Sequence, residues 1–115
     1  MTLRISLEDV IAKLELRTLV TIDGPMPDIC VSDLNRPGIE LAGYFNYFAH
    51  DRIQVLGKAE ISFLEELSRE VRQGRLEEFM AYDIPCVIIT RNLKPPREIL
   101  DLAAKHRRMV LETSV

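Results

Sequence analysis

The chain has 115 residues, of which 47% are hydrophobic and 29% are charged, and its formal net charge is −3 at pH 7. This length and composition are typical of one globular domain with its own hydrophobic core, and they exclude a disordered chain. The weakly negative charge gives no electrostatic reason to expect nucleic acid or an anionic membrane as a partner. No apolar run approaches the roughly 20 residues of a membrane-spanning helix, and residues 1–5 contain no long apolar stretch of a signal peptide, so we expect a cytoplasmic protein.

The N-terminal part predicts one helix and two short strands. Ser6 is a good N-cap residue, and apolar residues recur behind it at helical spacing, at Leu7, Val10, Ile11 and Leu14. Residues 17–22 are β-branched and apolar enough for a strand. Residues 23–27 contain a glycine and two prolines and predict a loop, and residues 29–31 predict a short buried strand.

The remaining chain alternates between strands and helices. Residues 52–56 predict a strand, and Ser62-Phe63-Leu64-Glu65 matches the S-x-x-E capping box, so a helix is expected to begin at Phe63. Gly74 is expected to end or interrupt that helix before a second short helix through Leu76, Phe79 and Met80. Continuous apolarity over 85–90 predicts a strand covered on both faces. Pro95-Pro96 predicts a helix start, and residues 109–111 predict a final strand.

The order of elements from Arg52 onward is strand, helix, strand, helix, strand. Each connection is long enough for a right-handed crossover between parallel strands. We therefore predict an α/β fold: a three-layer α/β/α domain with a mainly parallel sheet of about five strands and helices on both faces. An antiparallel edge is expected from the first part of the chain.

Three motifs in order give the chain a resemblance to a known family. The first is Val31 to Phe45, with an Asn-Arg-Pro-Gly turn, a short apolar stretch and a second glycine before aromatic residues. The second is Gly57 to Leu64, and the third is Ile88 to Leu93 followed by Pro95-Pro96. Over residues 7–114 the chain resembles the N-terminal domain of bacterial HPr kinase/phosphorylase, which phosphorylates and dephosphorylates a serine of the sugar-transport carrier HPr.

The resemblance implies a fold similar to the N-terminal domains of the Mur ligases. It also implies a homo-oligomeric enzyme of carbon catabolite control whose C-terminal kinase domain uses ATP or pyrophosphate with magnesium. The partners implied for this chain are that C-terminal domain, other subunits, and HPr through the full enzyme. No nucleic acid or membrane is implied.

The kinase machinery is absent from the chain itself. A phosphate-binding loop requires G-x-x-x-x-G-K-[ST]. At Gly57-Lys58, Arg52 stands where the first glycine is required, and Ala59 stands where Ser or Thr is required. We therefore expect no catalytic residue and no cofactor here, and we predict a non-catalytic regulatory and assembly domain of the phosphotransferase.

Residues around the Asn-Arg-Pro-Gly turn are candidates for binding or for structure. Arg36 can hold a phosphate or carboxylate bidentately, or it can pair with Asp33 or Glu40 and keep the loop closed. Gly38 permits a positive φ and Pro37 fixes its own φ, so the turn has a specified shape. Both the ligand-binding and the structural interpretation remain open.

Four of the seven aromatic residues lie within five positions, at Tyr44, Phe45, Tyr47 and Phe48. They can fill the core, or some of them can form an exposed patch that docks against another domain or subunit. A single strand or helix cannot direct all four to one side, which favours docking slightly.

The other reactive residue types form no recognisable site. His50 is expected at the surface, and His106 lies at the basic end of a predicted helix, where the helix dipole explains it. Cys30 and Cys86 are expected to be free, buried thiols, because both lie in apolar, strand-like surroundings of a chain that is expected to stay in the cytoplasm. The spacings of the two histidines and two cysteines match no zinc pattern. An alternative function is a free-standing domain that senses a nucleotide or sugar phosphate at the strand ends of its sheet. A related sensor module carries a D-R-T-G-G motif, but Asp51-Arg52 is followed here by Ile53-Gln54, which favours the first function.

Overall fold

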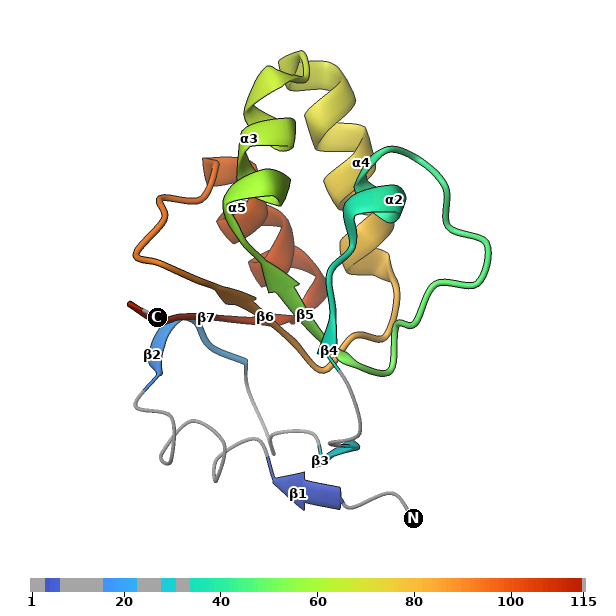
Figure 1. Ribbon diagram of the computed structural model, residues 1–115. Coiled ribbons are helices and arrows are strands. Elements are labelled where there is room, and N and C mark those ends of the chain that lie inside the picture. The colour runs from blue at the N-terminus through green and yellow to red at the C-terminus, as the bar shows by residue number, and fades with distance from the viewer. Residues whose placement is uncertain (1–3, 7–15, 23–27, 31–33, 115) are drawn as a thin grey trace.

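A five-stranded sheet organises the molecule in the computed structural model, which describes residues 4–6, 16–22, 28–30 and 34–114 (Figure 1). Its strands lie in the order β2-β7-β6-β5-β4. Their bounds are Arg17–Val20 for β2, Leu34–Asn35 for β4, Ile53–Leu56 for β5, Cys86–Ile89 for β6 and Met109–Glu112 for β7. A separate two-stranded antiparallel sheet joins β1 (Arg4–Ser6) to β3 (Asp28–Cys30).

Parallel pairing dominates the main sheet. Strands β4, β5, β6 and β7 are parallel to their neighbours, and β2 pairs antiparallel with β7 at one edge. The predicted α/β fold, the mainly parallel sheet of five strands and the antiparallel edge from the first part of the chain are confirmed. Strand β4 was not predicted, since it lies within the distinctive segment, whereas the predicted strand at 29–31 corresponds to β3 outside the main sheet.

The described helices lie together on one face of the sheet (Figure 1). They are α2 (Gly38–Leu41), α3 (Lys58–Glu66), α4 (Arg69–Ala81) and α5 (Arg97–His106). We expected the crossovers to place helices on both faces, and these helices do not do so. Strands β4 to β7 lie side by side in sequence order, so each connection leads to the next strand in the same direction. Right-handed crossovers that all run in one direction place their helices on the same face of the sheet. The helix expected over 7–14 and the loop expected over 23–27 lie outside the described residues.

Alternating side chains bury both faces of the central strands. Leu56, Val87, Ile89 and Val110 pack with the helices, whereas Ile53, Ile88 and Leu111 belong to a second buried cluster on the opposite face. All four residues of β6 are buried, which confirms the prediction for this strand. Cys86, in β6, is a free buried thiol as expected, and burial raises its pKa to about 12. The side chain of Cys30 lies outside the described residues.

Two predicted helix boundaries are wrong. Helix α3 begins at Lys58, and Ser62 is an exposed residue inside it rather than its N-cap. The N-cap serine is instead Ser68, whose Oγ accepts a hydrogen bond from Val71 N at 3.3 Å at the start of α4. Gly74 lies within α4 and does not interrupt it. Helix α5 begins directly after Pro96, as predicted.

Candidate functional site

The distinctive segment folds as a short strand, a turn and a single helical turn. Strand β4 ends at Asn35, and α2 begins at Gly38. Helix α2 closes with two hydrogen bonds, from Gly43 N to Glu40 O at 2.8 Å and from Tyr44 N to Ile39 O at 3.1 Å. This is the Schellman pattern, in which the residue after the C-cap adopts a left-handed conformation.

The glycine that needs conformational freedom is therefore Gly43, whose φ is 106°. Gly38, which permits a positive φ, is not among the described residues that have one. Gly38 is the first residue of α2, and no heavy atom lies within 4 Å of the position that its Cβ would occupy. The second glycine of the motif, rather than the first, specifies the backbone shape.

Arg36 connects this segment to the start of α3. Its Nη2 donates to Glu60 Oε1 at 2.9 Å, and the same carboxylate oxygen accepts from Gly57 N at 2.7 Å. A Cβ at Gly57 would lie 2.6 Å from Arg36 Nη2, so glycine allows the guanidinium to lie across the start of the helix. The partners that the sequence suggests for Arg36 are Asp33 and Glu40. Asp33 lies outside the described residues, and Glu60 was not anticipated.

The electrostatics of Glu60 follow from these contacts. Burial raises the pKa of Glu60, but hydrogen bonds from Arg36 and the Gly57 N–H lower it, and the net pKa is below its ordinary value of 4.5. Glu60 is 8% exposed, while the side chain of Arg36 remains 60% exposed. A buried carboxylate thus holds Nη2 of an arginine whose side chain is largely exposed.

A pocket of about 290 Å³ opens beside this pair, at the carboxyl ends of β4, β5 and β6. We call it the strand-end pocket. It is lined by Arg36, Val55, Gly57, Lys58, Ala59, Thr90 and Arg91. In an open α/β sheet this edge is where ligands usually bind. The structure thus places Arg36, a candidate from sequence, beside Lys58 and Arg91, which the sequence analysis did not identify.

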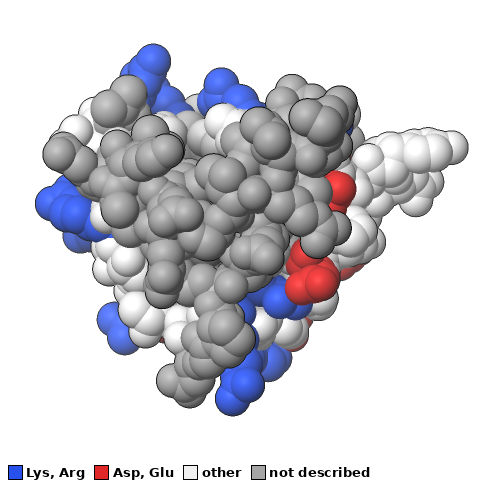
Figure 2. Space-filling view, turned by 90° about the horizontal axis from the view of Figure 1, so that it is seen from below, with Lys and Arg blue, Asp and Glu red and all other residues white. Residues whose placement is uncertain are grey.

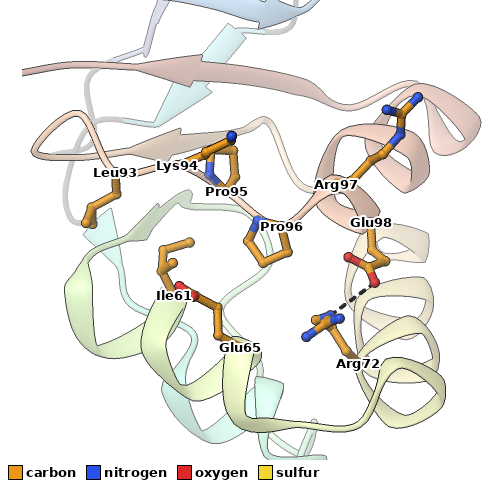
Figure 3. A pocket seen from close by; sticks show the side chains of 9 residues that line it. All are labelled: Ile61, Glu65, Arg72, Leu93, Lys94, Pro95, Pro96, Arg97 and Glu98. Atoms are coloured by element: carbon orange, nitrogen blue, oxygen red, sulfur yellow. Dashed lines mark hydrogen bonds and ion pairs between the residues drawn. The ribbon is translucent and has the colours of Figure 1, made fainter.

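An adjoining pocket of about 500 Å³ lies farther along the same helix and loop (Figure 3). It is lined by Ile61 and Glu65 of α3, Arg72 of α4, residues 93–96, and Arg97 and Glu98 of α5. Arg72 Nε donates to Glu98 Oε2 at 3.1 Å, and Arg72 Nη1 donates to Leu64 O at 3.1 Å. The side chain of Arg72 is only 18% exposed, and its contacts join α3, α4 and α5.

The four clustered aromatic residues divide between core and surface. Phe48 is buried against Phe79, and Phe45 stacks on Tyr82 with ring centroids 5.4 Å apart. Tyr44 is 50% exposed and Tyr47 is 97% exposed. These two tyrosines, which we call the tyrosine patch, lie on the segment that connects α2 to β5 (Figure 1). The account in which all four fill the core is wrong, and the docking hypothesis requires the exposure that the tyrosine patch shows.

Cationic side chains are visible on one face of the molecule although the net charge of the chain is negative. Viewed from below, Lys and Arg are visible at several places around the edge of the molecule (Figure 2). At the sheet edge, Arg17 is paired with Glu112 at 3.0 Å and donates to Asn92 Oδ1 at 3.1 Å.

No helix in the described part of the chain is long and apolar enough to cross a membrane.

Comparison with known proteins gives consistent results. Residues 5–115 match the sequence profile of the family described as HPr Serine kinase N terminus. The HPr kinase/phosphorylase of Caldanaerobacter subterraneus subsp. tengcongensis is 43% identical over 110 residues, which cover 96% of this chain and 36% of that protein. The HPr kinase/phosphorylase of Clostridium perfringens is 45% identical over 111 residues, which also cover 96% and 36%. The chain thus spans about a third of the length of these relatives.

One solved structure with a similar fold is the crystal structure of the CBS and DRTGG domains of the regulatory region of Clostridium perfringens pyrophosphatase, in complex with the activator diadenosine tetraphosphate. Its TM-score is 0.60 at 17% sequence identity, and the match covers 95% of this chain and 41% of that chain. At this level of identity the likeness establishes a shared fold.

Proposed function

Since the chain belongs to the family of HPr serine kinase N-terminal domains, we propose that it is the regulatory and assembly domain of an HPr kinase/phosphorylase. It supplies no catalytic group to phosphoryl transfer. A C-terminal kinase domain binds ATP or pyrophosphate with magnesium and acts on a serine of HPr in the cytoplasm. The domain described here contacts that kinase domain and other subunits of a homo-oligomer.

The non-catalytic role is supported by the short junction between β5 and α3. A phosphate-binding loop needs several residues between its strand and its helix, so that backbone N–H groups can surround a phosphate. Here Gly57 alone separates Leu56 from Lys58. The N–H of Gly57 already donates to Glu60, and Ala59 offers no hydroxyl for magnesium. The Gly-Lys dipeptide thus begins a helix that has no nucleotide cradle.

Incubation of the purified chain with HPr and magnesium-ATP tests this role. Mass spectrometry is expected to find no phosphorylated HPr, and isothermal titration is expected to give no micromolar binding of ATP. Phosphorylated HPr contradicts the non-catalytic role. Micromolar ATP affinity without phosphorylated HPr contradicts the expected absence of ATP binding and favours the sensing function described below. A kinase domain produced with this chain attached is the positive control, since the same assay must detect its product.

The assembly role depends on the tyrosine patch. A double substitution, Tyr44→Ser with Tyr47→Ser, in the full enzyme is expected to weaken assembly while leaving the unfolding temperature nearly unchanged, because both side chains are exposed in the domain. Val71→Ser on α4, where Val71 is 41% exposed, is the matched control. Sedimentation velocity measures the oligomer. An unchanged oligomer in the double variant contradicts docking through this patch.

A second function, sensing of a nucleotide or sugar phosphate, is favoured by one observation: the strand-end pocket is lined by three cationic side chains. The structurally similar pyrophosphatase regulatory region binds diadenosine tetraphosphate, which makes a ligand-responsive role reasonable for this fold. Sensing and assembly are compatible, because the strand-end pocket and the tyrosine patch share no residue.

A further inference from the structure

The strand-end pocket collects positive charge from three separate segments. Arg36 follows β4, Lys58 begins α3 after β5, and Arg91 follows β6. Because these strands are adjacent and parallel, their carboxyl ends meet at one edge and bring the three side chains around one cavity. Lys58 and Arg91 are exposed, and Arg36 is 60% exposed, so all three can reach a ligand from solvent.

Among the described residues, one carboxylate offsets part of the positive charge around the pocket. Glu60 is the carboxylate that contacts Arg36, and it accepts through one oxygen from a single Arg36 nitrogen. Guanidinium carries five N–H donors in a planar fork that matches phosphate oxygens, so most of the Arg36 donors remain available. Glu60 orients Arg36 and keeps a buried negative charge behind it, away from the solvent-facing side.

The backbone around the pocket is held in place by hydrogen bonds between elements. Thr90 N donates to Leu56 O at 3.2 Å, which ties the end of β6 to the end of β5. Asn92 N donates to Thr113 O at 3.0 Å. Arg91 and Asn92 both have positive φ, at 56° and 52°, so the chain turns sharply where the Arg91 side chain leaves it. This bracing means that Arg91 is anchored on a defined turn.

The start of α3 adds backbone donors to the same cavity. The N-cap of α3 is Gly57, which has no side chain that could cap the first turn. The first intrahelical hydrogen bond runs from Ile61 N to Gly57 O at 3.0 Å. The N–H groups of Lys58 and Ala59 come before this bond and therefore have no partner within the helix. Both residues line the pocket. The helix dipole favours negative charge at this position.

We infer that the strand-end pocket binds the phosphate group of a small phosphorylated metabolite, with Arg36, Lys58 and Arg91 as the charged contacts and the first turn of α3 as the source of backbone donors. The volume of about 290 Å³ lies at the lower end of the range for ligand pockets, so it suits a phosphate monoester on a small group better than a whole dinucleotide. The inference rests on the sensing function proposed second above and names its binding contacts, and it does not depend on the regulatory and assembly role.

Titration of the chain followed by amide NMR spectra tests this inference. Inorganic phosphate, glucose 6-phosphate, AMP and sodium sulfate are the probes. Saturable shifts centred on Lys58, Ala59 and Arg91 are expected with the phosphate monoesters. Glucose 6-phosphate binding more tightly than AMP assigns a sugar phosphate, and the reverse order assigns a nucleotide. Tightest binding of inorganic phosphate contradicts a phosphorylated metabolite as the ligand.

A pocket variant and a surface control separate binding in the pocket from general electrostatics. The double variant Lys58→Gln with Arg91→Gln should weaken binding of the best probe by at least about tenfold, because each substitution removes a charge-assisted contact. Arg69→Gln, at an exposed position of α4 that lines neither pocket, should change it by less than about twofold. Dispersed spectra of both variants establish that they are folded.

Three further results overturn the inference: no saturable shift with any monoester at concentrations up to about 10 mM, equal response to sulfate, or equal weakening by Arg69→Gln. None of these outcomes bears on phosphoryl transfer to HPr, which is measured separately with magnesium-ATP. Failure of the pocket and failure of the proposed function are therefore distinguishable.

Discussion

Replacing Gly43 by alanine tests the Schellman closure of α2 and should destabilise the domain by roughly 0.5–4 kcal/mol. A φ of 106° is a conformation that residues with a Cβ rarely adopt. The new Cβ would also lie 3.0 Å from Cζ and 3.1 Å from Nη1 of Arg75. Arg75 Nη1 donates to Leu41 O at 3.1 Å, so displacement of Arg75 weakens a second contact with α2.

The magnitude combines three effects of different sign. Backbone strain contributes about 1–3 kcal/mol, and loss of the Arg75 hydrogen bond contributes about 0.5–1.5 kcal/mol. Alanine reduces the conformational entropy of the unfolded chain, which offsets about 0.4–1 kcal/mol. Strain decides the sign, because it exceeds the entropic gain.

Urea unfolding followed by circular dichroism measures this effect, with Gly38→Ala as the matched control. Gly38 has no heavy atom within 4 Å of its Cβ position and lacks a positive φ, so the control should be neutral or stabilised by up to about 1 kcal/mol. A Gly43→Ala protein within about 0.5 kcal/mol of wild type would refute the reasoning. So would a control that is destabilised as much as Gly43→Ala.

Three further predictions concern packing, capping and pH. Phe48→Ala should lower the free energy of unfolding by roughly 3–5 kcal/mol, whereas Tyr47→Ala should change it by no more than about 0.5 kcal/mol. Similar losses for both variants in thermal unfolding would contradict the assignment of Phe48 to the core and Tyr47 to the surface. Ser68→Ala should lower the free energy of unfolding by about 1 kcal/mol, because the α4 N-cap is lost, and Ser62→Ala should lower it clearly less. The reverse order in urea unfolding would show that Ser62 caps a helix after all. The pKa of Glu60 is lowered on folding, so its contribution to stability is present above the ordinary value of 4.5 and is lost as the pH falls through its lowered value. Glu60→Gln should reduce that acid-side loss, and identical pH profiles of unfolding for variant and wild type would show that Glu60 does not contribute.

The sequence alone determined several local features of this protein. Continuous apolarity identified β6 as a strand buried on both faces, and Pro95-Pro96 identified the start of α5. These predictions succeed because burial and helix initiation leave a pattern in consecutive residues. The failed phosphate-binding motif at Gly57 could also be read directly, since it is a requirement on residue types at fixed spacing.

Tertiary structure decided which residues act together. Arg36 and Glu60 are 24 positions apart, and no local pattern indicates that Glu60 pairs with Arg36 and with Gly57 N. The same contact places the start of α3 at Lys58, which overrides the capping box expected at Ser62. A capping box is a weak, local signal for the start of a helix. A buried carboxylate must keep its hydrogen-bond partners, so the contacts of Glu60 have the larger effect on where α3 begins.

Strand order likewise could not be deduced from the chain. The alternation of strands and helices predicted parallel pairing, but only the sequential order of β4 to β7 placed the described helices on one face. That order also brought Arg36, Lys58 and Arg91 to one edge, although they are separated by 22 and 33 positions. Periodicity reports which side of an element is buried, and the neighbour against which it is buried depends on how the whole chain packs.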